Sequence, residues 1–176
     1  MPRTNREVSS EIQPQGGNHM EEILYQEPGR LFSRTTKVLL PVDGSKGTAR
    51  AATVAYELAE ITEAKLFILH VINIGMVQQI ANMSENDSLD ILTRYMTHGE
   101  RLLEAYKNAA TEYKLDIELV LEQGLPSDKI VSIVMEKSID IVVMGFSGAE
   151  KNDRGTLGSA TERVVRRAPC AVLVIK

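Results

Sequence analysis

The sequence has little cysteine, no long apolar run and no excess of basic residues. Its single cysteine, Cys170, excludes an intramolecular disulfide and a cysteine-based metal cluster. No apolar stretch approaches the roughly 18 residues that a membrane-spanning helix needs, and the first residues lack the apolar segment of a secretion signal. The net charge of −4 does not support a nucleic-acid-binding protein, which usually carries an excess of basic residues. These features predict a protein of a reducing, cytoplasmic compartment.

The composition is typical of one compact domain preceded by an extension. The chain has 176 residues, of which 43% are hydrophobic and 25% charged, enough for one core and too few for two catalytic domains. Residues 1–35 are rich in Glu, Gln, Asn, Gly, Pro and Ser and show no sustained period. We therefore expect a mostly flexible N-terminal extension over residues 1–35, with one short ordered turn in its more apolar second half. A single domain is expected over residues 36–176.

From Lys37 onward, apolar runs alternate with helical patterns. Short continuous apolar runs predict strands at residues 37–42, 65–72, 140–145 and 170–175. The alternating residues 116–122 predict a half-exposed strand near a sheet edge. Helical spacing predicts helices at residues 51–61, from an N-cap at Asp87 or Ser88 to about Tyr113, around residues 130–134, and at residues 159–167. Residues 75–84 read as a loop or irregular helix. Five strands alternating with helices predict an α/β fold with a mostly parallel sheet.

Two loops follow apolar strands and carry glycine and polar residues. In an open α/β sheet, ligands bind beyond the carboxyl ends of the strands. The first loop is Pro41 to Ser45. The second runs from Gly145 through Gly148 to Gly158-Ser159. Glycine lets backbone N–H groups approach an anion, and the start of the following helix favours a phosphate. The loop therefore predicts a phosphate cradle, with simple turns and a helix cap as the alternative interpretation of the same glycines.

The spacing Gly145-x2-Gly148-x9-Gly158-Ser159 resembles the nucleotide loop of ATP-binding members of the universal stress protein family. Pro41 to Ser45 resembles the first strand-to-helix turn of that family, and Leu69 to Val71 resembles the end of its second strand. The resemblance covers about residues 36–176 and excludes the extension. It implies a single Rossmann-like domain, an open five-stranded parallel sheet of order 3-2-1-4-5 with helices on both faces. Both loops would then meet in one crevice.

The resemblance also implies a role for each site residue. Asp43 would form a hydrogen bond with the ribose, and Gly145 would lie near the ribose. Pro41 would form part of the wall of the base pocket, and Val71 would bind adenine largely through its backbone. The residues expected to contact phosphates are Gly148, Gly158, Ser159, Ala160 and Thr161. Mg²⁺ or Mn²⁺ would be held mainly by phosphates and water. The candidate site also includes Val42, Phe146, Ser147 and Arg154.

Several of these residues have a second interpretation. The family often has a small hydroxylated residue followed by Arg or His between the first two glycines, where this chain has Phe146 and Ser147. Phe146 would either pack on the base or sugar of the nucleotide, or narrow the entrance to the nucleotide site. Arg154 would pair with a phosphate or remain a solvated charge. His70 reads as a core histidine with satisfied ring nitrogens rather than a catalytic residue.

Other enzyme classes fit the sequence poorly. The segment 145–149 nearly copies the Gly-x-Ser-x-Gly motif of hydrolases, but Ala149 replaces the last glycine and no histidine follows His98. The P-loop and the Gly-x-Gly-x-x-Gly dinucleotide motifs are absent. No general base stands out. The resemblance implies an ATP-binding switch protein in the stress response, and without a general base we expect at most slow ATP hydrolysis.

A nucleotide-independent homodimeric interaction module is the alternative function. The last strand, Ala171 to Ile175, is apolar and would form a sheet edge. Such an edge invites pairing with another chain, and the family resemblance implies a homodimer through it. The two functions are compatible, because nucleotide in the loop could alter a partner surface.

Overall fold

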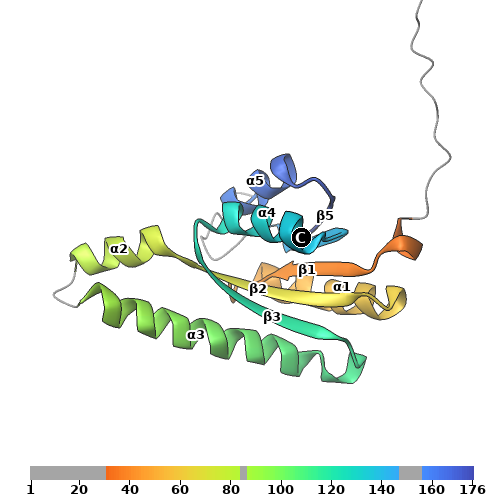
Figure 1. Cartoon of the computed structure of the whole chain (residues 1–176), viewed down its shortest axis with the longest axis horizontal. Coiled ribbons are helices and arrows are strands. Elements are labelled where there is room, and N and C mark those ends of the chain that lie inside the picture. The colour runs from red at the N-terminus through yellow and green to blue at the C-terminus, as the bar shows by residue number, and fades with distance from the viewer. Residues whose placement is uncertain (1–30, 84–86, 147–155) are drawn as a thin grey trace, which may run out of the picture.

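The computed structural model of the chain describes residues 31–83, 87–146 and 156–176 (Figure 1). The strands are β1 (Lys37–Pro41), β2 (Lys65–Asn73), β3 (Ile117–Gly124), β4 (Ile141–Gly145) and β5 (Ala171–Ile175). The α-helices are α1 (Lys46–Thr62), α2 (Ile74–Met83), α3 (Ser88–Ala109), α4 (Pro126–Lys137) and α5 (Ser159–Arg167). Two short 3₁₀ helices, η1 (Phe32–Arg34) and η2 (Thr111–Tyr113), precede β1 and β3. Within these described ranges, no helix is both long and apolar enough to cross a bilayer.

The five strands form one parallel sheet of order β3-β2-β1-β4-β5. The predicted fold class and strand order are therefore confirmed. The chain adds β2 and β3 on one side of β1, then returns to place β4 and β5 on the other side. Val38 of β1 consequently lies between Leu66 of β2 and Ile141 of β4. The reversal of strand order at β1 and β4 opens the place where α/β proteins of this topology bind ligands.

Helices cover both faces of the sheet, and Figure 1 shows α4 and α5 above the strands and α3 below them. Alternate side chains of β1 enter opposite layers. Leu40 packs with α1 and α3, whereas Leu39 packs with α4 and α5. Both side chains are fully buried, and each such burial stabilises the fold by about 1.5–3 kcal/mol. The central strands are hydrophobic on both faces for this reason.

Two local expectations differ from the structure. Residues 74–83 form the regular helix α2, because Val77 is buried and Ile80 packs in a cluster with Tyr95 and Met96 of α3. The long helix α3 has the expected N-cap, Asp87, which accepts a hydrogen bond from Leu89 N. It ends at Ala109 rather than near Tyr113, and the chain continues as η2.

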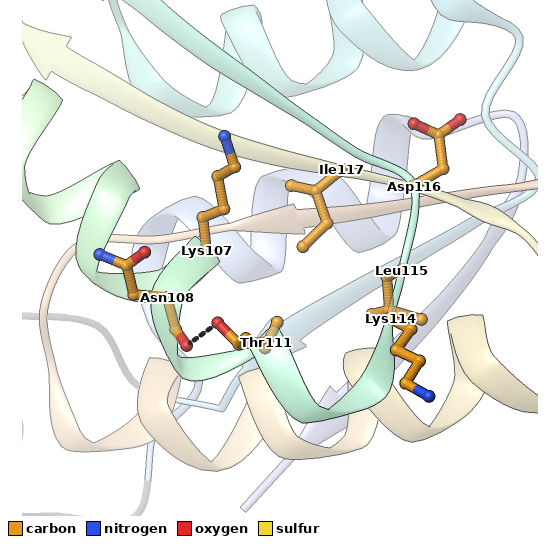
Figure 2. A pocket seen from close by; sticks show the side chains of 8 residues that line it. Lys107, Asn108, Thr111, Lys114, Leu115, Asp116 and Ile117 are labelled. Carbon is orange, nitrogen blue, oxygen red and sulfur yellow. Dashed lines mark hydrogen bonds between the residues drawn. The ribbon is translucent and has the colours of Figure 1, made fainter.

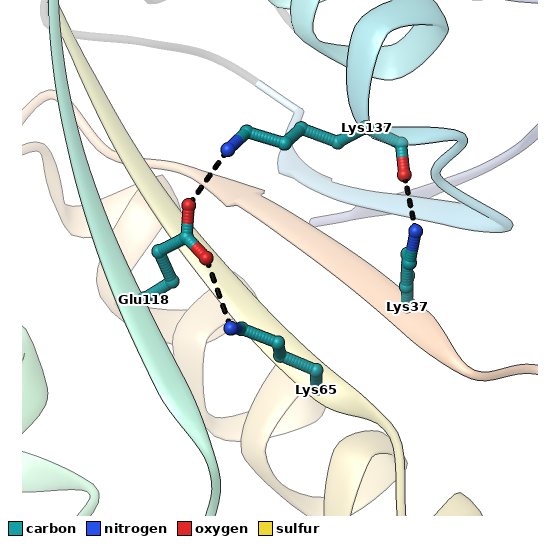
Figure 3. A network of polar contacts seen from close by, with 4 residues as sticks. All are labelled: Lys37, Lys65, Glu118 and Lys137. Carbon is teal, nitrogen blue, oxygen red and sulfur yellow. Dashed lines mark hydrogen bonds and ion pairs between the residues drawn. The ribbon is translucent and has the colours of Figure 1, made fainter.

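The amino ends of the strands are held by charged side chains. Asp140 accepts hydrogen bonds from the backbone N–H groups of Thr36 and Lys37, at 2.8 and 3.0 Å. Glu118 of β3 lies between the ammonium groups of Lys65 and Lys137, at 2.9 and 2.8 Å (Figure 3). These contacts fix the start of β1 and join the edge strand to α4. The opposite, carboxyl edge is left for the two loops that the sequence singles out.

Candidate functional site

The turn after β1 is built around Asp43. Its Oδ1 accepts hydrogen bonds from Ser45 N at 2.9 Å and from Thr48 Oγ1 at 2.5 Å. Ser45 caps α1, since its Oγ accepts from Thr48 N at 3.2 Å. Gly44 has a φ of +78°, which an L side chain rarely adopts. The carboxylate of Asp43 is therefore fixed at the first turn of α1, beyond the end of β1.

The ends of β1 and β2 lie side by side, as the implied strand order predicts. Pro41 is opposite Leu69 in the parallel register. Val42 is buried, and its N–H donates to the carbonyl of Leu69 at 2.7 Å. Its own carbonyl is 2.8 Å from Nδ1 of His70. The ring of His70 thus has a hydrogen-bond partner, as expected. Val71 continues β2 on the face covered by α4 and α5.

The end of β4 touches the start of α1 through backbone atoms. A Cβ placed on Gly145 would lie 2.7 Å from the carbonyl carbon of Gly47 and 3.0 Å from Thr48 N. Real side chains do not tolerate such distances, so this position requires glycine. The carbonyl of Gly145 also accepts a hydrogen bond from the buried hydroxyl of Thr161 at 3.0 Å. Gly145 therefore joins β4, α1 and α5 at one point.

The first turn of α5 has backbone donors of the kind that suit an anion. Gly158 is its N-cap, and a glycine has no side chain with which to cap the helix. Its N–H donates to the carbonyl of Phe146 at 2.9 Å, which ties α5 to the end of β4. In a helix that begins here, the N–H groups of Ser159, Ala160 and Thr161 have no carbonyl partner within the helix. These donors and the helix dipole favour negative charge. The hydroxyl of Thr161 is used by Gly145, so its backbone N–H is the group left to serve a phosphate.

Phe146 lies on the β5 side of this region. Its N–H donates to the carbonyl of Ile175 at 2.7 Å, and the ammonium of Lys176 is 5.0 Å from its ring centroid. A role for its ring against a base or sugar stays a prediction. Ser147, Gly148 and Arg154 fall outside the described residues.

The structure adds site neighbours that the sequence did not indicate. Thr48 bonds Asp43, and Gly47 packs on Gly145. From α3, Leu102 Cδ1 lies 3.6 Å from the position of a Cβ on Gly44. Burial, helped by the negative charge of Asp43, raises the pKa of Tyr106 above its ordinary value. The spacing of Leu102 and Tyr106 predicts only an apolar helix face.

A separate hollow lies at the opposite edge of the sheet. It has a volume of about 270 Å³ and is formed by the end of α3, by η2 and by the residues leading into β3. Figure 2 shows Lys107 and Lys114 on different sides of it. Because β3 begins here, this hollow lies at the amino end of the strands, away from Asp43 and Gly145 at their carboxyl ends. The two places can therefore be distinguished by mutation.

Comparison with known proteins agrees with the fold. The sequence pattern of the universal stress protein family matches residues 34–176. Universal stress protein MJ0531 of Methanocaldococcus jannaschii is 30% identical over 141 residues, 80% of this chain and 81% of that protein. The solved universal stress protein UspA of Lactobacillus plantarum is 25% identical. It superposes with a TM-score of 0.71 over 81% of this chain and 99% of its own.

Two further similar structures were solved with a nucleotide. A universal stress protein in complex with cAMP is 26% identical, with a TM-score of 0.57 over 80% of this chain and 96% of its own. A protein of the same family from Arabidopsis thaliana with AMP bound is 25% identical. Its TM-score is 0.56 over 80% of this chain and 91% of its own. The matched family pattern, the relatives and the similar fold of the solved structures lead to one conclusion: this chain belongs to the universal stress protein family.

Proposed function

We propose that this chain binds an adenine nucleotide, with ATP as its ligand, where β1, β2 and β4 end. The observation that carries the proposal is the convergence of three backbone features at Gly145. Thr48 of α1 bonds Asp43 at 2.5 Å, the start of α1 packs against Gly145, and the carbonyl of Gly145 accepts a bond from Thr161 in the first turn of α5 at 3.0 Å. A carboxylate beside helix N–H donors suits a ribose next to phosphates. The relatives with cAMP and AMP support an adenine base.

The residues present suit a metal ion that arrives with the nucleotide. The described part of the chain contains no group of three or more His, Cys, Asp or Glu side chains that could hold an ion. Mg²⁺ is usually held by one or two carboxylates together with substrate phosphates and water. At the candidate site, Asp43 supplies a carboxylate and Ser45 a hydroxyl. Mg²⁺ or Mn²⁺ bound through the phosphates would neutralise part of their charge as they approach Asp43.

The proposed role of ATP is to switch the protein rather than to be consumed. Asp43 already accepts two hydrogen bonds, and His70 is bonded to a carbonyl, so the described neighbours suit positioning better than proton transfer. We expect hydrolysis far slower than the enzyme median of about 10 per second. Sustained Mg²⁺-dependent turnover near that rate would contradict the switch role.

Calorimetric titration with ATP and Mg²⁺ tests the proposal on protein freed of copurified nucleotide. We expect a dissociation constant on the order of micromolar, with binding lost in Gly158→Val. Gly158 has φ −59° and ψ 143°, a conformation open to any residue. The variant should therefore fold, and its side chain would occupy the space of a phosphate.

A matched control comes from the hollow at the opposite edge of the sheet. Lys114→Ala removes a cation that lines that hollow and should leave ATP affinity within about twofold. Unchanged affinity in folded Gly158→Val, or loss of affinity in Lys114→Ala, would place the ligand elsewhere. Absence of binding by the wild-type protein would leave the nucleotide-independent interaction module as the better proposal.

A homodimer through β5 is a second proposal and is compatible with the first. β5 is a sheet edge, and all five of its residues, Ala171 to Ile175, keep some exposed surface. Leu173 is 38% exposed and Val165 of the neighbouring α5 is 45% exposed. An apolar edge strand with unpaired backbone groups is a template for pairing. A second copy of β5 would cover both the apolar side chains and the backbone groups.

A further inference from the structure

We infer that His70 is a positioning residue for the nucleotide site. It holds the peptide group that leads into Asp43, and Gly99 of α3 keeps the imidazole in place. The inference rests on the proposed function, since it assigns to His70 the orientation of a residue that would contact the nucleotide. It gives this histidine a role beyond filling the core.

The hydrogen bond of His70 determines which of its two ring nitrogens carries a proton. Nδ1 lies 2.8 Å from the carbonyl oxygen of Val42. A carbonyl oxygen only accepts, so Nδ1 carries the hydrogen. The N–H of Val42 also bonds β2, at the carbonyl of Leu69. Both backbone groups of Val42 are therefore held by β2, one through the strand and the other through the imidazole.

This bond orients Asp43 through the peptide plane. The carbonyl of Val42 belongs to the same planar peptide unit as the N–H of Asp43. Fixing that oxygen fixes the direction in which the chain enters Asp43. The carboxylate then meets Ser45 N and Thr48 Oγ1 at 2.9 and 2.5 Å. Without the imidazole, the peptide can rotate and the carboxylate loses its preset position.

Gly99 explains why the ring stays where it is. A Cβ on Gly99 would lie 2.8 Å from Cδ2 of His70 and 2.8 Å from Cδ1 of Leu121. The backbone of α3 therefore lies directly against the imidazole. A glycine inside a helix is less stable than an alanine there, and close packing on His70 is a physical reason for the glycine here. A larger residue at position 99 would push the ring away from Val42.

Two substitutions of His70 separate hydrogen bonding from packing. His70→Leu keeps a side chain that can pack in the same place but has no donor. His70→Asn keeps an N–H donor near the position of Nδ1. We expect His70→Leu to weaken ATP binding about tenfold, because the Val42 carbonyl loses its partner. His70→Asn should restore affinity to within about threefold of wild type.

Gly99→Ala tests the support from α3. It should weaken ATP binding about as much as His70→Leu, although it removes no polar group. In the His70→Asn background the same change should have a smaller effect, because no ring remains to be displaced. Such non-additivity is the signature of residues that act through one contact. Equal effects in both backgrounds would contradict the role of the ring.

A nucleotide-free measurement keeps this inference separate from the proposed function. Hydrogen exchange of the Ser45 amide reports its bond to Asp43, and we expect it to accelerate about tenfold in His70→Leu but not in His70→Asn. A ¹⁵N spectrum of the wild-type ring should show Nδ1 protonated. Failure of the wild type to bind ATP would refute the proposed function alone. Unchanged Ser45 exchange in His70→Leu, or an unprotonated Nδ1, would overturn the positioning role.

Discussion

Replacement of Gly145 by alanine is a direct test of how the site is assembled. The three atoms nearest to the added Cβ would all be backbone atoms, the carbonyl carbon and oxygen of Gly47 and the nitrogen of Thr48, at 2.7, 3.0 and 3.0 Å. None of these atoms can rotate away as a side chain would. To reach an ordinary contact of 3.4 Å, α1 and β4 must separate by roughly 0.7 Å.

The expected cost follows from overpacking. Strain of this kind typically costs about 1–3 kcal/mol, and the lower entropy of unfolded alanine offsets about 0.4–1 kcal/mol of it. A net loss of about 1–2 kcal/mol would lower the melting temperature by roughly 2–8 °C in a chain of this length. Because α1 carries Thr48, the same shift should weaken ATP binding. Thermal unfolding by circular dichroism and calorimetric titration measure the two effects.

Gly75→Ala is the matched control for this prediction. Gly75 is exposed in α2, and its added Cβ would meet only the side-chain oxygen of Asn73, at 3.3 Å. Alanine is the better helix former, so Gly75→Ala should melt within a few degrees of wild type or above it. If Gly145→Ala melted at or above the wild-type temperature with unchanged ATP affinity, the close contact of β4 with α1 would not govern the site.

Four further predictions follow from individual contacts. Thr161→Val removes the bond to the Gly145 carbonyl and should cost about 1–2 kcal/mol in urea unfolding, whereas Thr161→Ser should recover most of it. Burial acts to raise the pKa of Asp140, but hydrogen bonds from Thr36 and Lys37 outweigh it and leave that pKa below its ordinary value. Asp140 should therefore contribute stability above pH 4 that is lost as the pH falls through its lowered pKa. Asp140→Asn should cost about 1 kcal/mol at pH 7 and progressively less at lower pH. Bonds to Lys137 and Lys65 lower the pKa of Glu118 in the same sense, but this pair network is partly exposed. Glu118→Gln should cost less than about 1 kcal/mol, and the cost should shrink in high salt. Leu173→Arg places a charge on the exposed edge strand and should shift sedimentation from dimer to monomer, while an unchanged dimer would exclude β5 as the interface.

The sequence predicts those parts of the fold in which one residue pattern decides the structure. The continuous apolar run of residues 37–42 can be buried only between two helical layers, and β1 lies there. Residues 74–83 carry no such decisive pattern. Their helix depends on the contact of Val77 and Ile80 with α3. Such a tertiary contact cannot be predicted from the local sequence pattern.

The same distinction applies to the candidate site. Asp43 and Gly145 are predicted because each directly follows or ends a buried strand. The bond of Thr48 to Asp43 and the packing of Gly99 on His70 depend on where α1 and α3 lie against the sheet. The sequence feature that could have pointed to the second contact is Gly99, a glycine inside a long helix. The reason for this glycine can be seen only when β2 and its His70 are placed beside α3.

An NMR titration with ATP and Mg²⁺ would test the location of the site most directly. The account predicts that backbone amide signals of Asp43, Val71, Gly145 and Ser159 shift together with one dissociation constant. These residues come from four elements or turns that meet only at the carboxyl edge of the sheet. Shifts confined to Lys107 and Lys114 at the opposite edge, or no shifts at saturating ATP, would contradict it.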